Sequence, residues 1–302
     1  MDIPADIFEI IVCLLADDKQ ALCSLGLAWK GAIPAIRARR FKNVRHADGN
    51  RSRSPISPII ENAPEICVLI RTLSLFIRSN NTQVYPIITN AVNVQDLTFE
   101  WLTTSFYNAE NLSSCLAQYS SLTTLTFTNG FVEMSSFFSH LHAIPRLTTL
   151  TMSSLVIKEL KAITYKAWPT AATIYRALWD NHTGFKDCTP FERDTYDFEA
   201  PKPLPNITRL SLTVSNTSDL ILLDLISSTK SPFPNVENFT LSDCTGSCRT
   251  LRFNGLLQNF KTTLTTLELD EPGSKLHVLP FVLLLIFNQN ATGSAPSTSQ
   301  FH

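Results

Sequence analysis

One short pattern recurs seven times along the chain and constrains its fold more than any other feature. Each copy has apolar residues at positions 1, 4 and 6 and polar residues between them. The copies begin at Ile70, Val94, Leu122, Leu147, Ile207, Val236 and Leu264, so the steps between them are 24, 28, 25, 60, 29 and 28 residues. A unit of this size cannot bury its own apolar residues, so successive units are expected to stack on one another.

The alternation at the end of each copy predicts a strand with one buried face. Helix-like segments lie between the copies, at 109–119, 133–144, 219–228 and 250–260. Three strands follow an apolar-Pro-x triplet, in which proline ends the preceding helix and favours extended chain: Ile144-Pro145-Arg146, Leu204-Pro205-Asn206 and Phe233-Pro234-Asn235. A strand and a helix every 20–29 residues is typical of leucine-rich repeats. The expected fold class is therefore α/β, an irregular solenoid with parallel strands on its concave side and helices on its convex side.

The repeats are degenerate at the turn that follows each strand. The usual repeat has Asn or Cys three residues after the last strand leucine, and only Cys244, after Leu241, fits that position. The other copies have Arg78, Leu102, Gly130, Leu155, Ser215 and Pro272 there. We therefore expect each turn to be hydrogen-bonded in its own way. The double-length step holds an insertion at about 158–204.

Composition and charge exclude several classes of protein. Apolar residues make up 44% of the chain and charged residues 17%, as in ordered globular proteins. The net charge of −1 gives no reason to expect a nucleic-acid or membrane partner. We interpret the basic residues between Arg37 and Arg53 as a solvated helix end and linker. The seven scattered cysteines, with no secretion signal before them, predict reduced thiols and a cytoplasmic or nuclear location.

No pattern of catalytic residues or of metal ligands is present. The chain lacks the G-x-S-x-G, H-E-x-x-H and P-loop motifs. Cys244 and Cys248 lack the second pair of ligands that a zinc site needs. We expect a non-catalytic protein with no cofactor and no metal.

The first 45 residues predict a separate small helical module. Glu9 is the only charged residue between Ile7 and Leu15, a run too short to span a bilayer. On a helical wheel Ile7, Ile11 and Leu14 form one stripe, and Phe8, Val12 and Leu15 form the adjacent stripe. A module of this size cannot cover both stripes with its own core. One stripe is expected to pack on the following helices, and the other is left for a partner or for the first repeat.

The same residues resemble an F-box. The resemblance is carried by Ile3-Pro4-Ala5-Asp6-Ile7, then Ile11 and Leu15, Asp17-Asp18, a leucine-rich second helix, Trp29 and the basic stretch through Val44. The sequence of this segment is most similar to those of F-box proteins with leucine-rich repeats from mushroom-forming (basidiomycete) fungi. Gly26 and Gly31 are departures, because each is a poor helix former.

The resemblance implies a partner and a set of contact residues. F-box proteins bind the Skp adaptor and, through it, a cullin–RING ubiquitin ligase. The residues that the resemblance assigns to the Skp adaptor are Ile3, Pro4, Ile7, Phe8, Ile11, Leu14, Leu15, Leu22, Leu25 and Trp29. Together with the repeats, this predicts the domains 1–45 (F-box), 46–64 (linker) and 65–290 (repeats, with the insertion at about 158–204), followed by a disordered tail at 291–302.

The repeats are then expected to hold an unidentified protein target. Their outward strand positions are mostly hydroxyl residues, which suit any exposed strand and need bind nothing. The insertion interleaves aromatic and acidic residues, which favours either target binding or cover for the repeats. The candidate target-binding residues are Arg209, Trp168, Phe191, Tyr196 and Phe198. We predict that the apolar segment 276–287 forms the helix of a last repeat.

The expected function is that of a substrate receptor in a Skp–cullin–F-box ubiquitin ligase. The alternative is a leucine-rich-repeat scaffold that binds proteins without a ligase. A third hypothesis is a decayed copy that has no working partner at either end.

Overall fold

A computed structural model describes residues 4–48, 56–77, 85–102, 110–157, 201–214, 222–223, 225–226, 231–243, 259–271 and 274–278. The chain divides into two compact units. The first comprises Met1–Val132 and Ser139–Leu147, and the second comprises Glu133–Phe138 and Thr148–His302. The fold is mixed α/β, with parallel strands in both units.

The first unit begins with a cluster of short helices: α1 Ala5–Leu14, α2 Lys19–Ala28, the 3₁₀ helix η1 Lys30–Ala32 and α3 Ile33–Phe41. Asp18 caps α2, because its side chain accepts a 2.9 Å hydrogen bond from the backbone N–H of Ala21. Asp6 in the first turn of α1, and Arg39 and Arg40 in the last turn of α3, have the charges that the helix dipoles favour. Local sequence therefore fixes where these helices begin and end.

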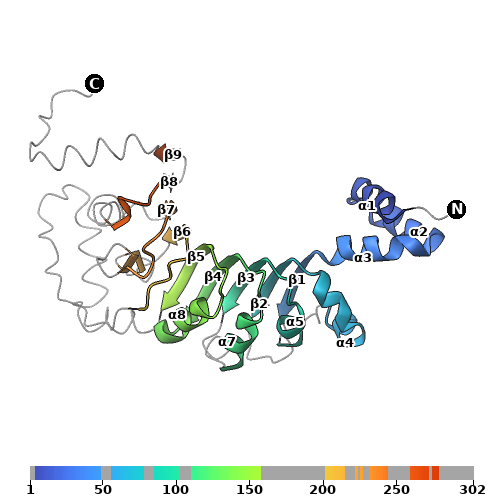
Figure 1. The fold of residues 1–302 in the computed structure, drawn as a ribbon, viewed down its shortest axis with the longest axis horizontal. Helices are drawn as coiled ribbons and strands as arrows, with labels where there is room; N and C mark the ends of the chain where they lie inside the picture. Colours follow the sequence, from blue (N-terminus) through green and yellow to red (C-terminus); the bar gives the residue numbers. More distant parts are fainter. Residues whose placement is uncertain are drawn as a thin grey trace, which may run out of the picture. The chain divides into compact units, whose positions relative to one another are not determined.

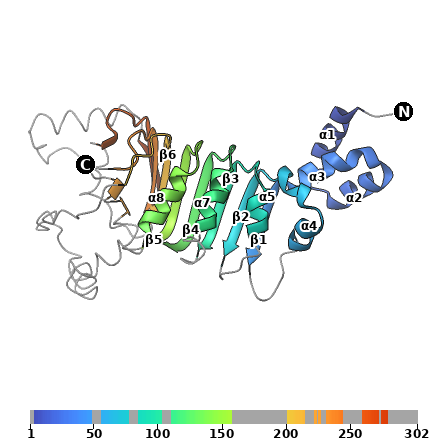
Figure 2. The ribbon, with the colours of Figure 1, turned by 60° about the horizontal axis from the view of Figure 1, so that its bottom comes forward.

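Four parallel strands follow in chain order: β1 Asn43–Asp48, β2 Thr72–Ile77, β3 Asp96–Leu102 and β4 Thr124–Val132. The segments between them include α4 Ile56–Asn62, η2 Pro64–Leu69, α5 Tyr85–Asn90 and α7 Glu110–Ala117. α5 and α7 lie against the same face of this sheet (Figures 1 and 2). Each strand and the helix after it thus form one layer of the stack.

The register of the strands puts like residues side by side. Val44, Leu73, Leu97 and Leu125 form one buried row across the sheet. His46, Leu75, Phe99 and Phe127 form the next, in which the rings of Phe99 and Phe127 stack 5.7 Å apart. The alternating apolar pattern of the sequence is therefore the buried face of the sheet.

The helices complete the core of the first unit. Ile66 and Cys67 in η2, and Ile87 and Ile88 in α5, are buried. Tyr119, just after α7, is fully buried, and its hydroxyl donates a 2.6 Å hydrogen bond to the carbonyl of Ile88. Burial raises the pKa of the Tyr119 hydroxyl and that of the Cys67 thiol above their ordinary values.

The second unit has four further parallel strands: β5 Thr149–Ile157, β6 Arg209–Val214, β7 Asn238–Asp243 and β8 Thr266–Glu271. Leu150, Leu210 and Phe239 are register partners and are buried. The helix α8 Met134–His142 begins in the second unit, where Phe138 lies 6.3 Å, between ring centroids, from Phe233. All seven strands that the repeated pattern predicts are present.

The last strand differs from the prediction. β9, Ser274–Val278, pairs antiparallel with β8, so Leu276–Val278 are extended where the sequence predicts a helix. In the backbone register Leu276 pairs with Leu269, and Val278 pairs with Leu267. The reason is the Pro272-Gly273 dipeptide, which favours a chain reversal directly after β8. Residues 279–287 of the predicted helix lie outside the described residues.

The structure also has ordered elements where the sequence predicts a linker. β1 runs to Asp48 and α4 covers Ile56–Asn62, both within or overlapping the interval 46–64. The pattern search missed β1 because Asn43 to Asp48 has only Val44 and Ala47 as apolar residues. Its pairing with β2 and the burial of His46 make it a strand. The tail at 291–302 and most of the insertion, 158–200, lie outside the described residues.

Side-chain hydrogen bonds join the segments that precede successive strands. Asn93 donates from its side chain to the carbonyl of Val68 at 2.8 Å, and Asn235 donates to that of Pro205 at 2.9 Å. Thr263 donates to the carbonyl of Val236 at 2.8 Å. Each bond connects one repeat to the repeat before it. Cys244, the position that fits the usual pattern, lies outside the described residues.

Candidate interaction surfaces

The N-terminal helices share a small core. Phe8 and Val12 of α1, Leu22 of α2, Ala32 of η1 and Ile36 of α3 are buried together. The ring of Trp29 packs edge-on to Phe8, with centroids 5.6 Å apart. The stripe of α1 that contains Phe8 and Val12 thus packs inside the helical cluster, as the sequence predicts.

Two glycines allow the helices to approach closely. A Cβ at Gly26 would lie 3.3 Å from Cδ1 of Ile36, and one at Gly31 would lie 3.3 Å from Cε2 of Phe8. The sequence marks both glycines as poor helix formers. The structure shows that both contact the small core, where an added Cβ would make the neighbouring side chain shift by a few tenths of an ångström.

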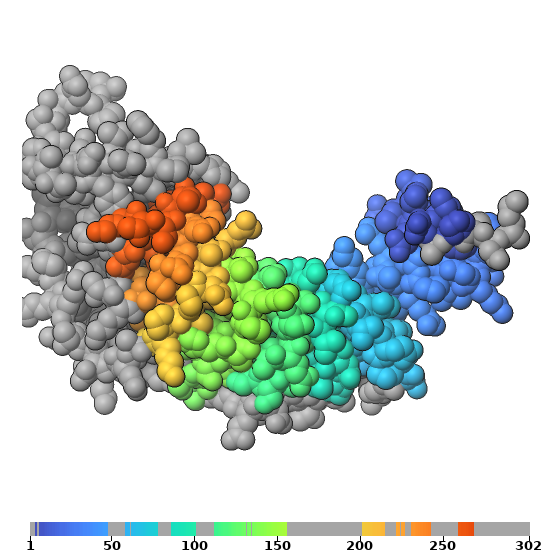
Figure 3. All heavy atoms as spheres, in the orientation of Figure 1, coloured from blue at the N-terminus to red at the C-terminus, as the bar shows by residue number. Residues whose placement is uncertain are grey.

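The opposite side of α1 is apolar and exposed. We call Ile7, Ile10, Ile11 and Leu14 the apolar stripe, because the spacing of three and four residues puts them on one face of the helix. Leu14 is 80% exposed, Ile10 56% and Ile7 44%. Atoms of α1 lie at the surface of the helical cluster (Figure 3). Leu27, at the end of α2, is exposed as well. So many large exposed aliphatic side chains in one short segment indicate a docking surface.

The residues that the sequence assigns to the adaptor divide by burial. Pro4, Ile7, Leu14 and Trp29 are exposed, whereas Ile11, Leu15 and Leu25 are half-buried. Phe8 and Leu22 are buried in the small core and are not available to a partner. Ile3 lies outside the described residues. Ile10 and Leu27 are exposed as well but are not among the residues assigned to the adaptor, although the helical wheel places Ile10 beside Leu14 on the same face as Ile7.

The basic residues of α3 and the start of β1 face solvent. Arg37, Arg39, Arg40, Lys42 and Arg45 are exposed. Arg45 forms a 2.7 Å ion pair with Glu100 across β2. This arrangement agrees with a solvated helix end. Arg51 and Arg53 lie outside the described residues.

The polar face of the strands is a second candidate surface. In the first unit Thr72, Asp96 and Thr124 form one row, and Ser74, Thr98 and Thr126 form the next. In the second unit the rows are Thr149, Arg209, Asn238 and Thr266, then Thr151, Ser211, Thr240 and Glu268. Except for the exposed Arg209, all are half-buried. The outward positions read from the sequence thus lie together on one face in each unit.

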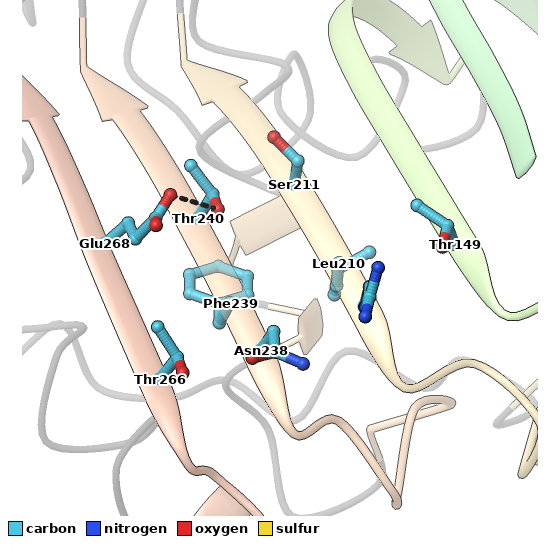
Figure 4. Close-up of a pocket in the computed structure, with 9 residues that line it drawn as sticks. Thr149, Leu210, Ser211, Asn238, Phe239, Thr240, Thr266 and Glu268 are labelled. Atoms are coloured by element: carbon cyan, nitrogen blue, oxygen red, sulfur yellow. Dashed lines mark hydrogen bonds between the residues drawn. The ribbon is translucent and has the colours of Figure 1, made fainter. Parts of the chain in front are cut away.

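A pocket of about 280 Å³ lies on this face of the second unit. It is lined by Thr149, Arg209, Leu210, Ser211, Asn238, Phe239, Thr240, Thr266 and Glu268, which come from β5, β6, β7 and β8 (Figure 4). The hydroxyl of Thr240 lies 3.3 Å from Oε2 of Glu268 and donates to it. We call this site the strand-face pocket. Its lining can supply hydrogen bonds, one positive charge and one negative charge.

Other candidate groups give no further site in the described part. Trp168, Phe191, Tyr196 and Phe198, the aromatic residues proposed for target binding, lie outside it. Cys67 and Cys115 are buried free thiols, and Cys13 and Cys23 are exposed ones. No three His, Cys, Asp or Glu side chains in this part are grouped so as to hold a metal ion. No described helix is both long enough and apolar enough to cross a membrane.

Comparison with known proteins gives no relative. No family model matches the chain, and no match was found among curated proteins or solved structures.

Proposed function

We propose that the chain is a non-catalytic substrate receptor of a Skp–cullin–F-box ubiquitin ligase. Its N-terminal helices would bind the Skp adaptor as an F-box, and its parallel-strand units, as leucine-rich repeats of an α/β solenoid, would bind a target protein. The ligase subunits would supply the ubiquitin chemistry. This chain would contribute by holding the target near the bound conjugating enzyme.

The apolar stripe of α1 is the observation that carries the proposal. The small core already uses Phe8 and Val12, so the exposed side chains of Ile7, Ile10 and Leu14 have no role inside the cluster. An amphipathic helix of this kind suits an apolar groove on another protein. Burying such side chains is worth up to about 1.5–3 kcal/mol each, before the costs of ordering and association. The F-box resemblance of the same residues favours the Skp adaptor as the partner.

A scaffold without a ligase is the second candidate. The polar strand faces favour it as much as they favour a receptor, because they do not depend on the N-terminal helices. The two candidates differ in one respect: only the ligase receptor needs the apolar stripe to bind a Skp adaptor.

The test is co-expression of the full chain with a fungal Skp adaptor. We expect a one-to-one complex in size-exclusion chromatography and a measurable Kd in calorimetry. Leu14→Asp and Ile7→Asp should abolish binding, because each puts a carboxylate into an apolar contact. Ile59→Asp in α4 is the matched control, since Ile59 is 38% exposed but lies outside the helical cluster.

Circular dichroism would establish that each variant is folded. Failure of the folded wild type to bind the adaptor would exclude the receptor and favour the scaffold. Equal binding by Leu14→Asp and the wild type would show that the adaptor contacts another surface.

A further inference from the structure

Arg209 differs from the other residues that line the strand-face pocket. Its side chain is exposed at the start of β6. The ion pair of Arg45 with Glu100 is the only salt bridge among the described residues, so Arg209 forms none with any of them. A guanidinium is a strong hydrogen-bond donor. That of Arg209, at the edge of the pocket, has no charged acceptor in the described part of the chain.

The first unit shows the same arrangement with the charges paired. Arg45 is in register with Ser74 and Thr98, and Glu100 lies two residues further along β3. Arg209 is in register with Asn238 and Thr266, and Glu268 lies two residues further along β8. The offset is two strands and two residues in both cases. Arg45 contacts Glu100 at 2.7 Å, whereas Glu268 accepts a hydrogen bond from Thr240.

The strand between the charges explains this difference. In the first unit the residue beside Glu100 on β2 is Phe76, which offers no side-chain donor. In the second unit it is Thr240, which holds the carboxylate of Glu268. Arg209 and Glu268 therefore form no ion pair with each other, and both line the pocket, where Glu268 lies beside Thr240 (Figure 4).

The chemistry of the lining selects the kind of ligand. A guanidinium binds carboxylate or phosphate through two parallel hydrogen bonds. Glu268 in the same pocket repels negative charge, and it repels a doubly charged phosphate more strongly than a carboxylate. The amide of Asn238 and the hydroxyls of Thr149 and Thr266 can bond to neutral groups beside the anion. The pocket thus favours a single carboxylate with polar neighbours.

We propose that the strand-face pocket binds the carboxylate of an Asp or Glu side chain in an extended segment of a partner protein, with Arg209 as the anchoring residue. The pocket is several times larger than the roughly 30 Å³ of one water, enough for a side chain and the adjoining peptide groups. The role of this site in recruiting a target protein rests on the proposed function. Binding of the carboxylate itself does not require the adaptor.

The test uses the full chain and three blocked pentapeptides that differ only at the central position, which is glutamate, glutamine or phosphoserine. Titrations followed by saturation-transfer NMR give the relative affinities. We expect the glutamate peptide to bind about tenfold more tightly than the other two. Arg209→Gln should weaken glutamate binding about tenfold, and Arg209→Lys should weaken it less, because lysine keeps the charge but loses the fork. Glu268→Gln should strengthen it.

Arg45→Gln is the matched control, since it makes the same change on the polar strand face of the first unit, and it should leave peptide binding unchanged. Equal binding of the glutamate and glutamine peptides, or unchanged binding by folded Arg209→Gln, would overturn the proposal. Tighter binding of the phosphoserine peptide would replace the carboxylate by a phosphate. Adaptor binding measured on the same Arg209→Gln protein separates this outcome from a failure of the proposed function.

Discussion

Asn129 and Ser154 are the only non-glycine residues with a positive φ in the described part of the chain, at 55° and 52°. They occupy equivalent positions in β4 and β5. The left-handed backbone interrupts the two-residue alternation: Leu125 and Phe127 are buried before Asn129, and Gly130 and Val132 are buried after it. Gly130 and Leu155, which stand where the usual repeat has Asn or Cys, thus each follow a residue in the left-handed conformation.

This conformation predicts the effect of substitutions at Asn129. Valine at a left-handed position should lower the free energy of unfolding by about 1–2 kcal/mol, whereas glycine should be near neutral. Urea unfolding of Asn129→Val and Asn129→Gly checks this, with Thr128→Val on the same strand as the control. Equal stability of the valine and glycine variants would contradict it.

Tyr119 predicts a dependence of stability on pH. Removing its hydroxyl leaves the buried carbonyl of Ile88 without that donor, so Tyr119→Phe should cost about 1–3 kcal/mol at neutral pH. Burial raises the pKa of Tyr119, so only the unfolded state ionises near pH 10, and the wild type loses stability above that pH. The phenylalanine variant has no hydroxyl to ionise, so it does not lose stability in this way. The stability gap between the two proteins should therefore narrow above pH 10 in denaturant titrations, and a constant gap would be inconsistent with a buried neutral hydroxyl.

At the scale of elements, α1 has two apolar faces with opposite roles. The face with Phe8 and Val12 holds α2, η1 and α3 together, and the apolar stripe does not. Phe8→Ala should therefore cost about 3–5 kcal/mol, the usual range for a buried aromatic residue. Leu14→Ala should change stability by less than about 0.5 kcal/mol.

Amide hydrogen exchange in α2 distinguishes the two variants. Phe8→Ala should speed exchange there, because the core that holds α2 loses its largest side chain. Leu14→Ala should leave it unchanged. Slower folding of Leu14→Ala, or faster amide hydrogen exchange in its α2, would mean that the apolar stripe packs on this chain and is not a docking surface.

At the scale of the whole molecule, the two candidate surfaces belong to different compact units. The apolar stripe lies in the first unit and the strand-face pocket in the second. Because Leu14 and Arg209 belong to different compact units, their substitutions should act independently. Leu14→Asp should abolish adaptor binding and keep peptide affinity, and Arg209→Gln should do the reverse. A double variant whose losses differ from the sum of the single losses in calorimetry would reveal coupling between the surfaces.

The sequence by itself determined the elements that depend on local pattern. Seven strands, the polar face and the two stripes of α1 follow from the spacing of apolar residues, because side chains alternate on a strand and recur every 3.6 residues on a helix. Asp18 fixes the start of α2 through its side-chain hydrogen bond, and the proline triplets fix element ends through their backbone preference.

Only the tertiary structure decided which residues are used and which are left over. β1 has too few apolar residues to be recognised alone and exists through its pairing with β2. Gly26 and Gly31 look unfavourable in a helix until their contacts with Ile36 and Phe8 are seen. Phe8 and Ile10 are equally apolar in sequence, yet the small core buries Phe8 and leaves Ile10 exposed. Arg45 and Arg209 stand at the same offset from a glutamate, yet among the described residues only Arg45 forms an ion pair. Such outcomes depend on neighbours that are distant in the chain, which no local pattern contains.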